Sequence, residues 1–309
     1  MILLKLKQHK YILAAITSTL MWGFFSIPLR NLKQFPSDEI LLYRIYASLI
    51  FTWLIMLVFR KKQMTSDLKY VKSLKNADKR NLYLLIIAAG FLITGNWFSF
   101  IYAINHVSLQ SAAFAYMVCP LITAFGGFLI LKESLTRLKI FAIAIALISI
   151  FLLSQGSVNH LLWSIFIATL YSFYLIIQRI VTNLDKFNML GIQLVISSIL
   201  SLPLYFFNHY VFVTDFYFWI NIVIISILFT IVPLFLSLYA LIGIPSSTLG
   251  IIIYLNPIVS FGVAFLYFNE RMSLYQVGAY ALLFFAVVVF NWNMLYSFGK
   301  KFSKPIAAN

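Results

Sequence analysis

Charged residues are scarce in this sequence of 309 residues. Asp, Glu, Lys and Arg make up 10% of the chain, whereas 62% is hydrophobic; a soluble domain carries about 25% charged residues. The charges are also clustered, so long apolar runs contain none. This composition excludes an ordinary soluble domain and predicts a membrane protein.

Features that define several other classes of protein are missing as well. Cys119 is the single cysteine, which excludes a disulfide framework and a thiolate metal cluster. The sequence has no glycine-rich phosphate loop, no metal-ligand spacing and no soluble segment long enough to hydrolyse ATP. We therefore expect no cofactor, no metal, no catalytic residues and no primary pump.

Acidic side chains are absent from the middle of every long apolar run. A central Asp or Glu is the usual carrier of a coupling proton or sodium ion. Carboxylate-based coupling is therefore disfavoured, and Glu39, near a membrane edge, is the weak candidate that remains. The net charge of +15 does not indicate nucleic acid, because the basic residues lie in short connectors between apolar runs.

Apolar runs of the length that crosses a bilayer recur along the chain. A helix needs about 20 such residues, and these runs lack the alternation of barrel strands. We predict an all-α polytopic membrane protein, with the lipid bilayer as a partner and ten transmembrane helices. The predicted spans are 11–29, 39–60, 82–104, 108–131, 138–155, 161–180, 188–207, 218–241, 246–268 and 274–296.

The basic residues in the connectors predict an orientation. With the N-terminus in the cytoplasm, 19 lysines and arginines lie inside and three outside, which agrees with the positive-inside rule. Both termini are then cytoplasmic. The basic segment 60–81 is expected to lie against anionic headgroups, with a solvated tether as the alternative.

The two halves of the chain resemble each other at an offset of 137 residues. Pro120 then matches Pro257, and Glu133 matches Glu270. We expect two domains, 1–155 and 156–309, of five helices each. Because five is odd, the second copy runs inverted, as in many secondary transporters. The two glutamates follow their spans directly, which predicts helix caps or ion pairs with the neighbouring arginines.

Short motifs in both halves resemble a known family. They include Leu20-Met21-Trp22-Gly23, Asn96-Trp97, Cys119-Pro120-Leu121 and Asn256-Pro257. In order and spacing they are similar to EamA-type transporters, especially the RarD group of the drug/metabolite transporter superfamily. The resemblance implies two inverted EamA repeats, a central cavity open to one side at a time, and the bacterial inner membrane.

Arg44 is the sharpest candidate for a substrate-binding residue. Arginine at a helix centre costs about 2.5–3.5 kcal/mol on insertion scales, so it usually faces a cavity or a partner. We interpret Arg44 as an anchor for an anionic substrate group; snorkelling to the outer headgroups or a structural hydrogen-bond hub are the alternatives.

The remaining candidates are prolines, amides and aromatic residues within predicted spans. Pro120 and Pro257 are expected to interrupt corresponding helices and to act in gating, or to be passive kinks. Asn96 either binds substrate or cross-links helices. Trp22 and Tyr171 are further aromatic residues that could line a cavity. The expected substrate-binding residues are Arg44, Asn96, Trp97, Tyr102, Tyr116, Tyr239, Tyr254 and Asn256.

These features predict a secondary transporter of small organic molecules, metabolites or drugs, in the export direction. A non-transporting membrane receptor or scaffold is the alternative. An intramembrane enzyme would need catalytic His, Asp or Ser side chains at one depth, and the sequence offers no such group.

Overall fold

The computed structural model describes residues 2–106, 109–154, 158–208, 213–269 and 274–290, together with 292 and 296. Within these ranges the regular secondary structure is entirely helical. The helices of the first half are α1 (Ile2–Gly23), α2 (Ser26–Arg30), α3 (Ser37–Phe59), α4 (Lys61–Ser73), α5 (Asn76–His106), α6 (Leu109–Leu131) and α7 (Arg137–Ser154). Those of the second half are α8 (Val158–Ile180), α9 (Lys186–Asn208), α10 (Phe216–Ser226), the π-helical η1 (Ile227–Ile231), α11 (Val232–Gly243), α12 (Ser246–Ile252), α13 (Leu255–Leu266) and α14 (Leu274–Phe290).

Every predicted span overlaps a helix or a consecutive run of helices. Among the described residues, six helical segments are long and apolar enough to cross a membrane, and shorter apolar helices cover 115–131, 246–260 and 277–290. Large apolar side chains lie on the outside of the bundle: Phe59 and Phe207, for example, are 79% and 80% exposed. Exposed apolar surface on this scale requires a lipid covering, so the chain has the architecture of a multi-pass membrane protein.

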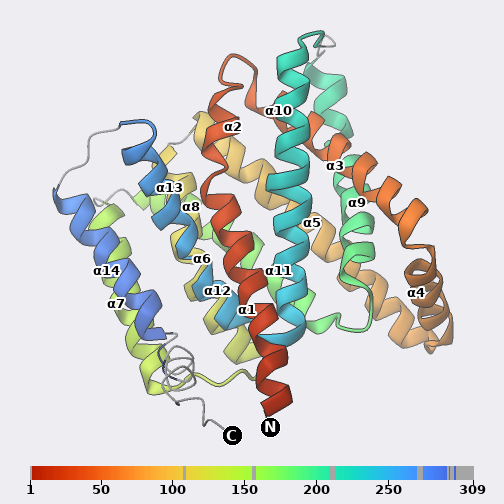
Figure 1. The fold of residues 1–309 in the computed structure, drawn as a ribbon, viewed down its shortest axis with the longest axis horizontal. Helices are drawn as coiled ribbons and strands as arrows, with labels where there is room; N and C mark the ends of the chain where they lie inside the picture. Colours follow the sequence, from red (N-terminus) through yellow and green to blue (C-terminus); the bar gives the residue numbers. More distant parts are fainter. Residues whose placement is uncertain are drawn as a thin grey trace, which may run out of the picture.

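The segment 60–81 contains a helix that its apolar pattern did not indicate. In α4, Met64 packs against the main core and Val71 against a smaller one, while Lys61, Lys69 and Lys72 are exposed. The helix is therefore amphipathic, with one face on the protein and the other basic. Figure 1 shows α4 at one edge of the bundle.

The two prolines behave differently from the expectation that both interrupt a helix. Pro120 lies inside α6, which continues without a break. The carbonyl of Cys119 accepts hydrogen bonds from the hydroxyls of Thr123 at 2.8 Å and Ser172 at 3.0 Å, so neighbouring hydroxyls reinforce the backbone around the proline. In the second half the break comes earlier, at Ile253–Tyr254. Pro257 lies in the first turn of α13, where the missing N–H has no helical partner to lose.

Helix contacts between the two halves follow a repeated pattern. The first helix of one half packs against the other half in both cases: α1 on α11, and α8 on α5. The remaining corresponding helices pair directly, namely α3 with α9, α6 with α12, and α7 with α14. Figure 1 shows the last pair side by side at one edge. The contacts between the halves are therefore reciprocal for these helices.

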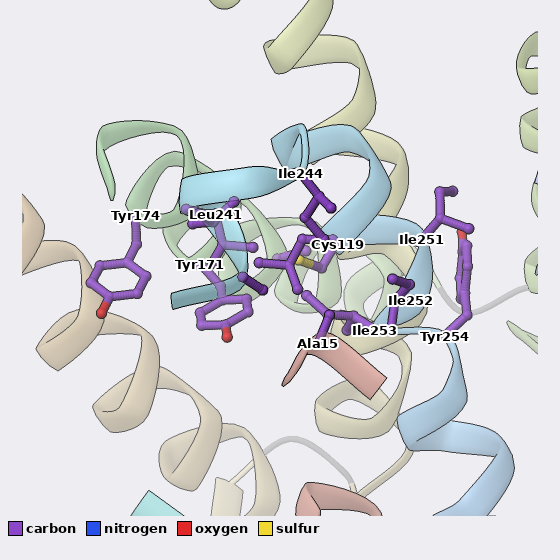
Figure 2. Packing of buried hydrophobic residues seen from close by; sticks show 14 of the residues in the cluster. Ala15, Cys119, Tyr171, Tyr174, Leu241, Ile244, Ile251, Ile252, Ile253 and Tyr254 are labelled. Atoms are coloured by element: carbon purple, nitrogen blue, oxygen red, sulfur yellow. The ribbon is translucent and has the colours of Figure 1, made fainter. Parts of the chain in front are cut away.

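The central core joins the two halves. Figure 2 shows Ala15 of α1, Cys119 of α6, Tyr171 of α8 and Leu241 of α11 converging, with Tyr254 from the turn between α12 and α13.

The close contact between α1 and α11 depends on a glycine. At Gly243 an added Cβ would come within 1.8 Å of the Tyr11 ring, so α1 and α11 can approach this closely only without a side chain there.

Candidate functional site

Arg44 lies in the eighth position of α3, about 10 Å along the helix axis from its start. Its guanidinium carbon is 4.9 Å from the ring centre of Trp97 in α5 and 5.8 Å from that of Phe25, between α1 and α2. Both are cation–π distances. Tyr116 of α6 is close enough to interact electrostatically with the same guanidinium. We call Arg44, Phe25, Trp97 and Tyr116 the Arg44 cluster.

The guanidinium of Arg44 has no polar partner. Within the described ranges, no carboxylate lies at ion-pair distance and its side chain donates no hydrogen bond; its Nε has no exposed surface and no acceptor. A buried, unpaired charge is costly. The four side chains of the cluster nevertheless keep part of their surface accessible, unlike Tyr174 or Phe218, which are fully buried.

The aromatic rings continue from the Arg44 cluster into the second half. Tyr116 contacts Tyr171 of α8 edge-on, with ring centres 6.2 Å apart, and Tyr171 in turn meets Trp22 of α1 at 6.3 Å. The Trp22 indole N–H donates to the carbonyl of Phe229 in η1, at 3.1 Å. The cluster therefore borders helices of both repeats.

Two other predicted site residues, Asn96 and Tyr254, are buried between helices. The side-chain amide of Asn96 donates to the carbonyl of Ile167 in α8 at 2.9 Å, while its oxygen is buried and has no hydrogen-bond partner within the described ranges. Asn96 thus cross-links α5 and α8. Tyr254 is fully buried, and its hydroxyl also has no partner among the described residues.

Asn256 and the two prolines lie where the halves cross. The side-chain oxygen of Asn256 accepts from the hydroxyl of Ser260 at 3.2 Å, and that hydroxyl also lies 3.2 Å from the carbonyl of Gly23 in α1. Pro120 faces α12, since a Cβ added at Gly250 would meet its Cα at 3.4 Å. These positions bear on helix packing between the repeats rather than on the Arg44 cluster.

Two predicted site residues lie elsewhere. Tyr102 is 41% exposed and stacks on Trp163 with ring centres 5.2 Å apart. Tyr239 packs against Tyr11 at 5.0 Å, with the ammonium of Lys10 5.5 Å from its ring centre. Neither belongs to the Arg44 cluster.

Glu133, in the connector after α6, binds the start of α12 in the other repeat. Its carboxylate accepts from the backbone N–H and the hydroxyl of Ser246, both at 2.8 Å, and from the N–H of Ser247 at 3.0 Å. Burial raises the pKa of Glu133, but the hydrogen bonds from Ser247 and Ser246 outweigh it and hold the pKa below its usual value. The predicted cap is therefore confirmed, with a partner from the other half; Glu270 lies outside the described residues.

A second group of polar contacts joins α4 to the start of α9. We call the contacts of Glu133 with Ser246 and Ser247 the Glu133 clasp, and this second group, formed by Arg60, Asp67, Asp185 and Asn188, the Asp185 clasp. The Asp185 carboxylate accepts from Arg60 Nη2 at 2.7 Å and from the backbone N–H groups of Phe187 and Asn188 at 3.0 and 3.1 Å. Asp67 of α4 accepts from the Asn188 amide at 2.6 Å. Sequence patterns did not indicate this clasp, because its members lie in separate connectors.

Phe25 is the member of the Arg44 cluster that the sequence analysis missed. Phenylalanine is abundant in this chain, with 31 residues, so no single one stands out. Its position two residues after the Trp22-Gly23 motif is the only signal that could have indicated it.

The fold and this site define a polytopic helical membrane protein made of two related halves, with an unpaired cation among aromatic rings. The model of the EamA-like transporter family matches residues 9–155 and again 159–292. The chain belongs to the EamA-like transporter family, which is a family of transporters and not of enzymes.

Proteins from several bacteria match nearly the whole chain. Protein RarD of Streptomyces exfoliatus is 27% identical, over 89% of this chain and 86% of that protein. The uncharacterized transporter YojE of Bacillus subtilis is 25% identical, over 94% and 96%. Protein RarD of Escherichia coli is 24% identical, over 93% and 95%. A crystal structure of a protein 14% identical superimposes with a TM-score of 0.71, covering 90% of this chain and 95% of that one, which shows a shared fold.

Proposed function

We propose that the chain is a secondary transporter that exports small organic molecules, metabolites or drugs, by alternating access between two inverted five-helix repeats. The observation that carries the proposal is the unpaired, partly accessible guanidinium of Arg44 among aromatic rings that reach into both halves. Membership of a transporter family and the reciprocal helix contacts between the halves support it. Repeats that are related but not identical can exchange roles, which gives two conformations open to opposite sides.

The proposed topology has ten crossings of the bacterial inner membrane, with both termini in the cytoplasm. Contacts between connectors agree with the sides that the charge count assigns. Segments assigned to the inside contact one another, as Glu133 does Ser246 and Arg60 does Asp185. On the opposite side, the amide of Asn31 donates to that of Asn221 at 3.1 Å.

The two clasps lie at the ends of the helices that this topology places in the cytoplasm. The Arg44 cluster lies nearer the other end, because α3 enters from the outside. The arrangement fits a state in which the cytoplasmic side is closed by polar contacts between repeats. In this mechanism, breaking the Glu133–Ser246 contact accompanies opening toward the cytoplasm.

The test combines ligand-induced thermal stabilisation with flux. Purified protein is screened against amino acids, nucleosides and amphenicol-like drugs, and compounds that stabilise it are tested for flux in proteoliposomes beside Arg44→Ala. We expect at least one compound to stabilise the protein and to cross the membrane, with flux lost in Arg44→Ala. Stabilising compounds that never cross would contradict transport and indicate a receptor or scaffold. Undiminished flux in the variant would leave the transporter in place and remove Arg44 from its site.

A further inference from the structure

Among the described residues, Arg44 has aromatic rings beside its guanidinium but no carboxylate at ion-pair distance. Glu133 accepts hydrogen bonds from the start of α12, Asp67 from Asn188, Asp185 from Arg60 and Asp215 from the backbone N–H of Tyr217, and none of these carboxylates pairs with Arg44. A guanidinium has five N–H donors, and leaving even one of them buried without an acceptor costs folding free energy. In Arg44 the Nε donor is buried in this way. A ligand that supplies negative charge and acceptor oxygens would remove this cost.

The absence of a second described arginine beside Arg44 also limits how many negative charges a bound ligand can carry. Of the other described arginines, Arg30 lies 3.9 Å from the ring centre of Phe268, Arg60 pairs with Asp185 and Arg179 donates to the carbonyl of Leu241, while Arg80 and Arg137 are exposed on the surface. One guanidinium matches one carboxylate, which it can bind through two parallel hydrogen bonds. A dianionic phosphate would remain half compensated.

The neighbours of Arg44 favour a flat, apolar body attached to that carboxylate. Trp97, Phe25 and Tyr116 surround the guanidinium and are only partly buried, and aromatic rings stack well on planar groups. A cationic ligand would be repelled by Arg44, and a neutral one would leave its charge unpaired.

We propose that the substrates are monoanionic carboxylates with an aromatic body, bound with the carboxylate on Arg44 and the ring against Trp97, Phe25 and Tyr116. This inference rests on the proposed function, since it names the substrate class of the same site. A purely structural arginine would instead bond helix carbonyls or an acid, and Arg44 bonds neither within the part of the chain that the structure describes.

Three probes of nearly the same shape test the charge requirement: phenylacetate, phenylacetamide and 2-phenylethylamine. Binding to the purified protein is measured by thermal shift and by quenching of tryptophan fluorescence. We expect phenylacetate to bind at least tenfold more tightly than the amide, and the amine not to bind. Equal binding of carboxylate and amide, or binding of neither, overturns the inference.

Variants at Arg44 test whether this residue causes the preference for phenylacetate over phenylacetamide. In Arg44→Gln the tenfold preference for the carboxylate should disappear, and in Arg44→Lys, which keeps the charge but loses the paired donors, it should persist in weakened form. Arg137→Gln is the matched control, because it removes an exposed arginine far along the sequence from the cluster and should leave the preference unchanged. A preference retained in Arg44→Gln contradicts the assignment, and unliganded melting of each variant verifies folding.

Flux in proteoliposomes separates this inference from the proposed function. If phenylacetate binds through Arg44 but does not cross the membrane, the substrate class stands as a ligand class and transport fails. If a neutral or cationic compound crosses, and crosses equally well in Arg44→Gln, transport stands and the anionic class is wrong.

Discussion

The charged groups at the helix ends and the charge of Arg44 differ in their surroundings: the former have hydrogen-bond partners, and the latter has none among the described residues. Glu133 accepts three hydrogen bonds from the start of α12, and Asp185 accepts from Arg60 and two backbone N–H groups. Arg44, deeper in the bundle, has aromatic neighbours and no polar partner among the described residues. The charges that hold the repeats together therefore have polar partners, whereas none of the described polar groups pairs with the guanidinium of Arg44.

This difference assigns separate roles to the two regions. Removing a clasp residue should lower stability, because the partners it leaves behind lose their hydrogen bonds. Removing the charge of Arg44 should change ligand binding and leave the fold intact, since no partner is left behind. The variants below challenge that division in order of expected effect on stability.

Asp185→Ala should be the most destabilising, by about 2 kcal/mol. The variant loses the cap of α9, worth about 1 kcal/mol, and a partly exposed charge-assisted hydrogen bond to Arg60 of comparable size. The unfolding midpoint in a denaturing-detergent titration, followed by tryptophan fluorescence, measures the change. Asp185→Asn is the control, because it keeps oxygen acceptors for the cap and should lose about half as much. A midpoint unchanged in both variants would show that this clasp does not stabilise the fold.

Glu133→Ala should cost about 1.5 kcal/mol, since it leaves the N–H groups of Ser246 and Ser247 without their acceptor. The clasp also needs a glycine at position 127. A Cβ added at Gly127 would lie 2.8 Å from both the Glu133 carboxylate and the Ser246 hydroxyl. Gly127→Ala should therefore also lower the unfolding midpoint.

The Glu133 clasp should also be sensitive to acid. Its folded-state pKa lies below the ordinary value of 4.5, so its stabilisation is complete above that pH. The stabilisation is lost as the pH falls through the lowered folded pKa. The melting temperatures of wild type and Glu133→Gln, compared between about pH 6 and pH 3, should therefore converge at the acid end. A difference that stays constant over this range would contradict the role of the carboxylate charge.

Asn96→Ala should have the smallest effect, about 0.6 kcal/mol, the average for one hydrogen bond between membrane helices. The variant loses the bond to the Ile167 carbonyl that joins α5 to α8. The detergent unfolding midpoint measures this as well. If Asn96→Ala instead abolishes flux while the midpoint is unchanged, Asn96 belongs to the substrate site.

The sequence was sufficient to locate the long apolar helices. Long uncharged runs leave a helix as the local solution in lipid, so 39–60 and 188–207 agree closely with α3 and α9. It was insufficient for α4, whose apolar residues are few and lie on one face. It also misplaced the interruption in the second half, because proline in a first turn fits a helix, and the break falls at Ile253–Tyr254 instead.

The candidate site was predictable in part. Arg44 stood out because an arginine within an apolar run is costly, and Trp97 stood out through its motif. That the two meet, at 4.9 Å, depends on how α3 packs beside α5, which no local pattern specifies. Tyr102 and Tyr239 belong to the same residue class, yet tertiary packing turns them to other surroundings.

The unfolding midpoint of ligand-free Arg44→Met shows whether Arg44 stabilises the fold. Methionine keeps an apolar side chain beside Trp97 and removes a charge that has no polar partner among the described residues, so the cost of burying that charge is removed. We expect a midpoint equal to or above that of the wild type. A midpoint lowered as far as in Glu133→Ala would contradict it, because the guanidinium would then be holding the fold together.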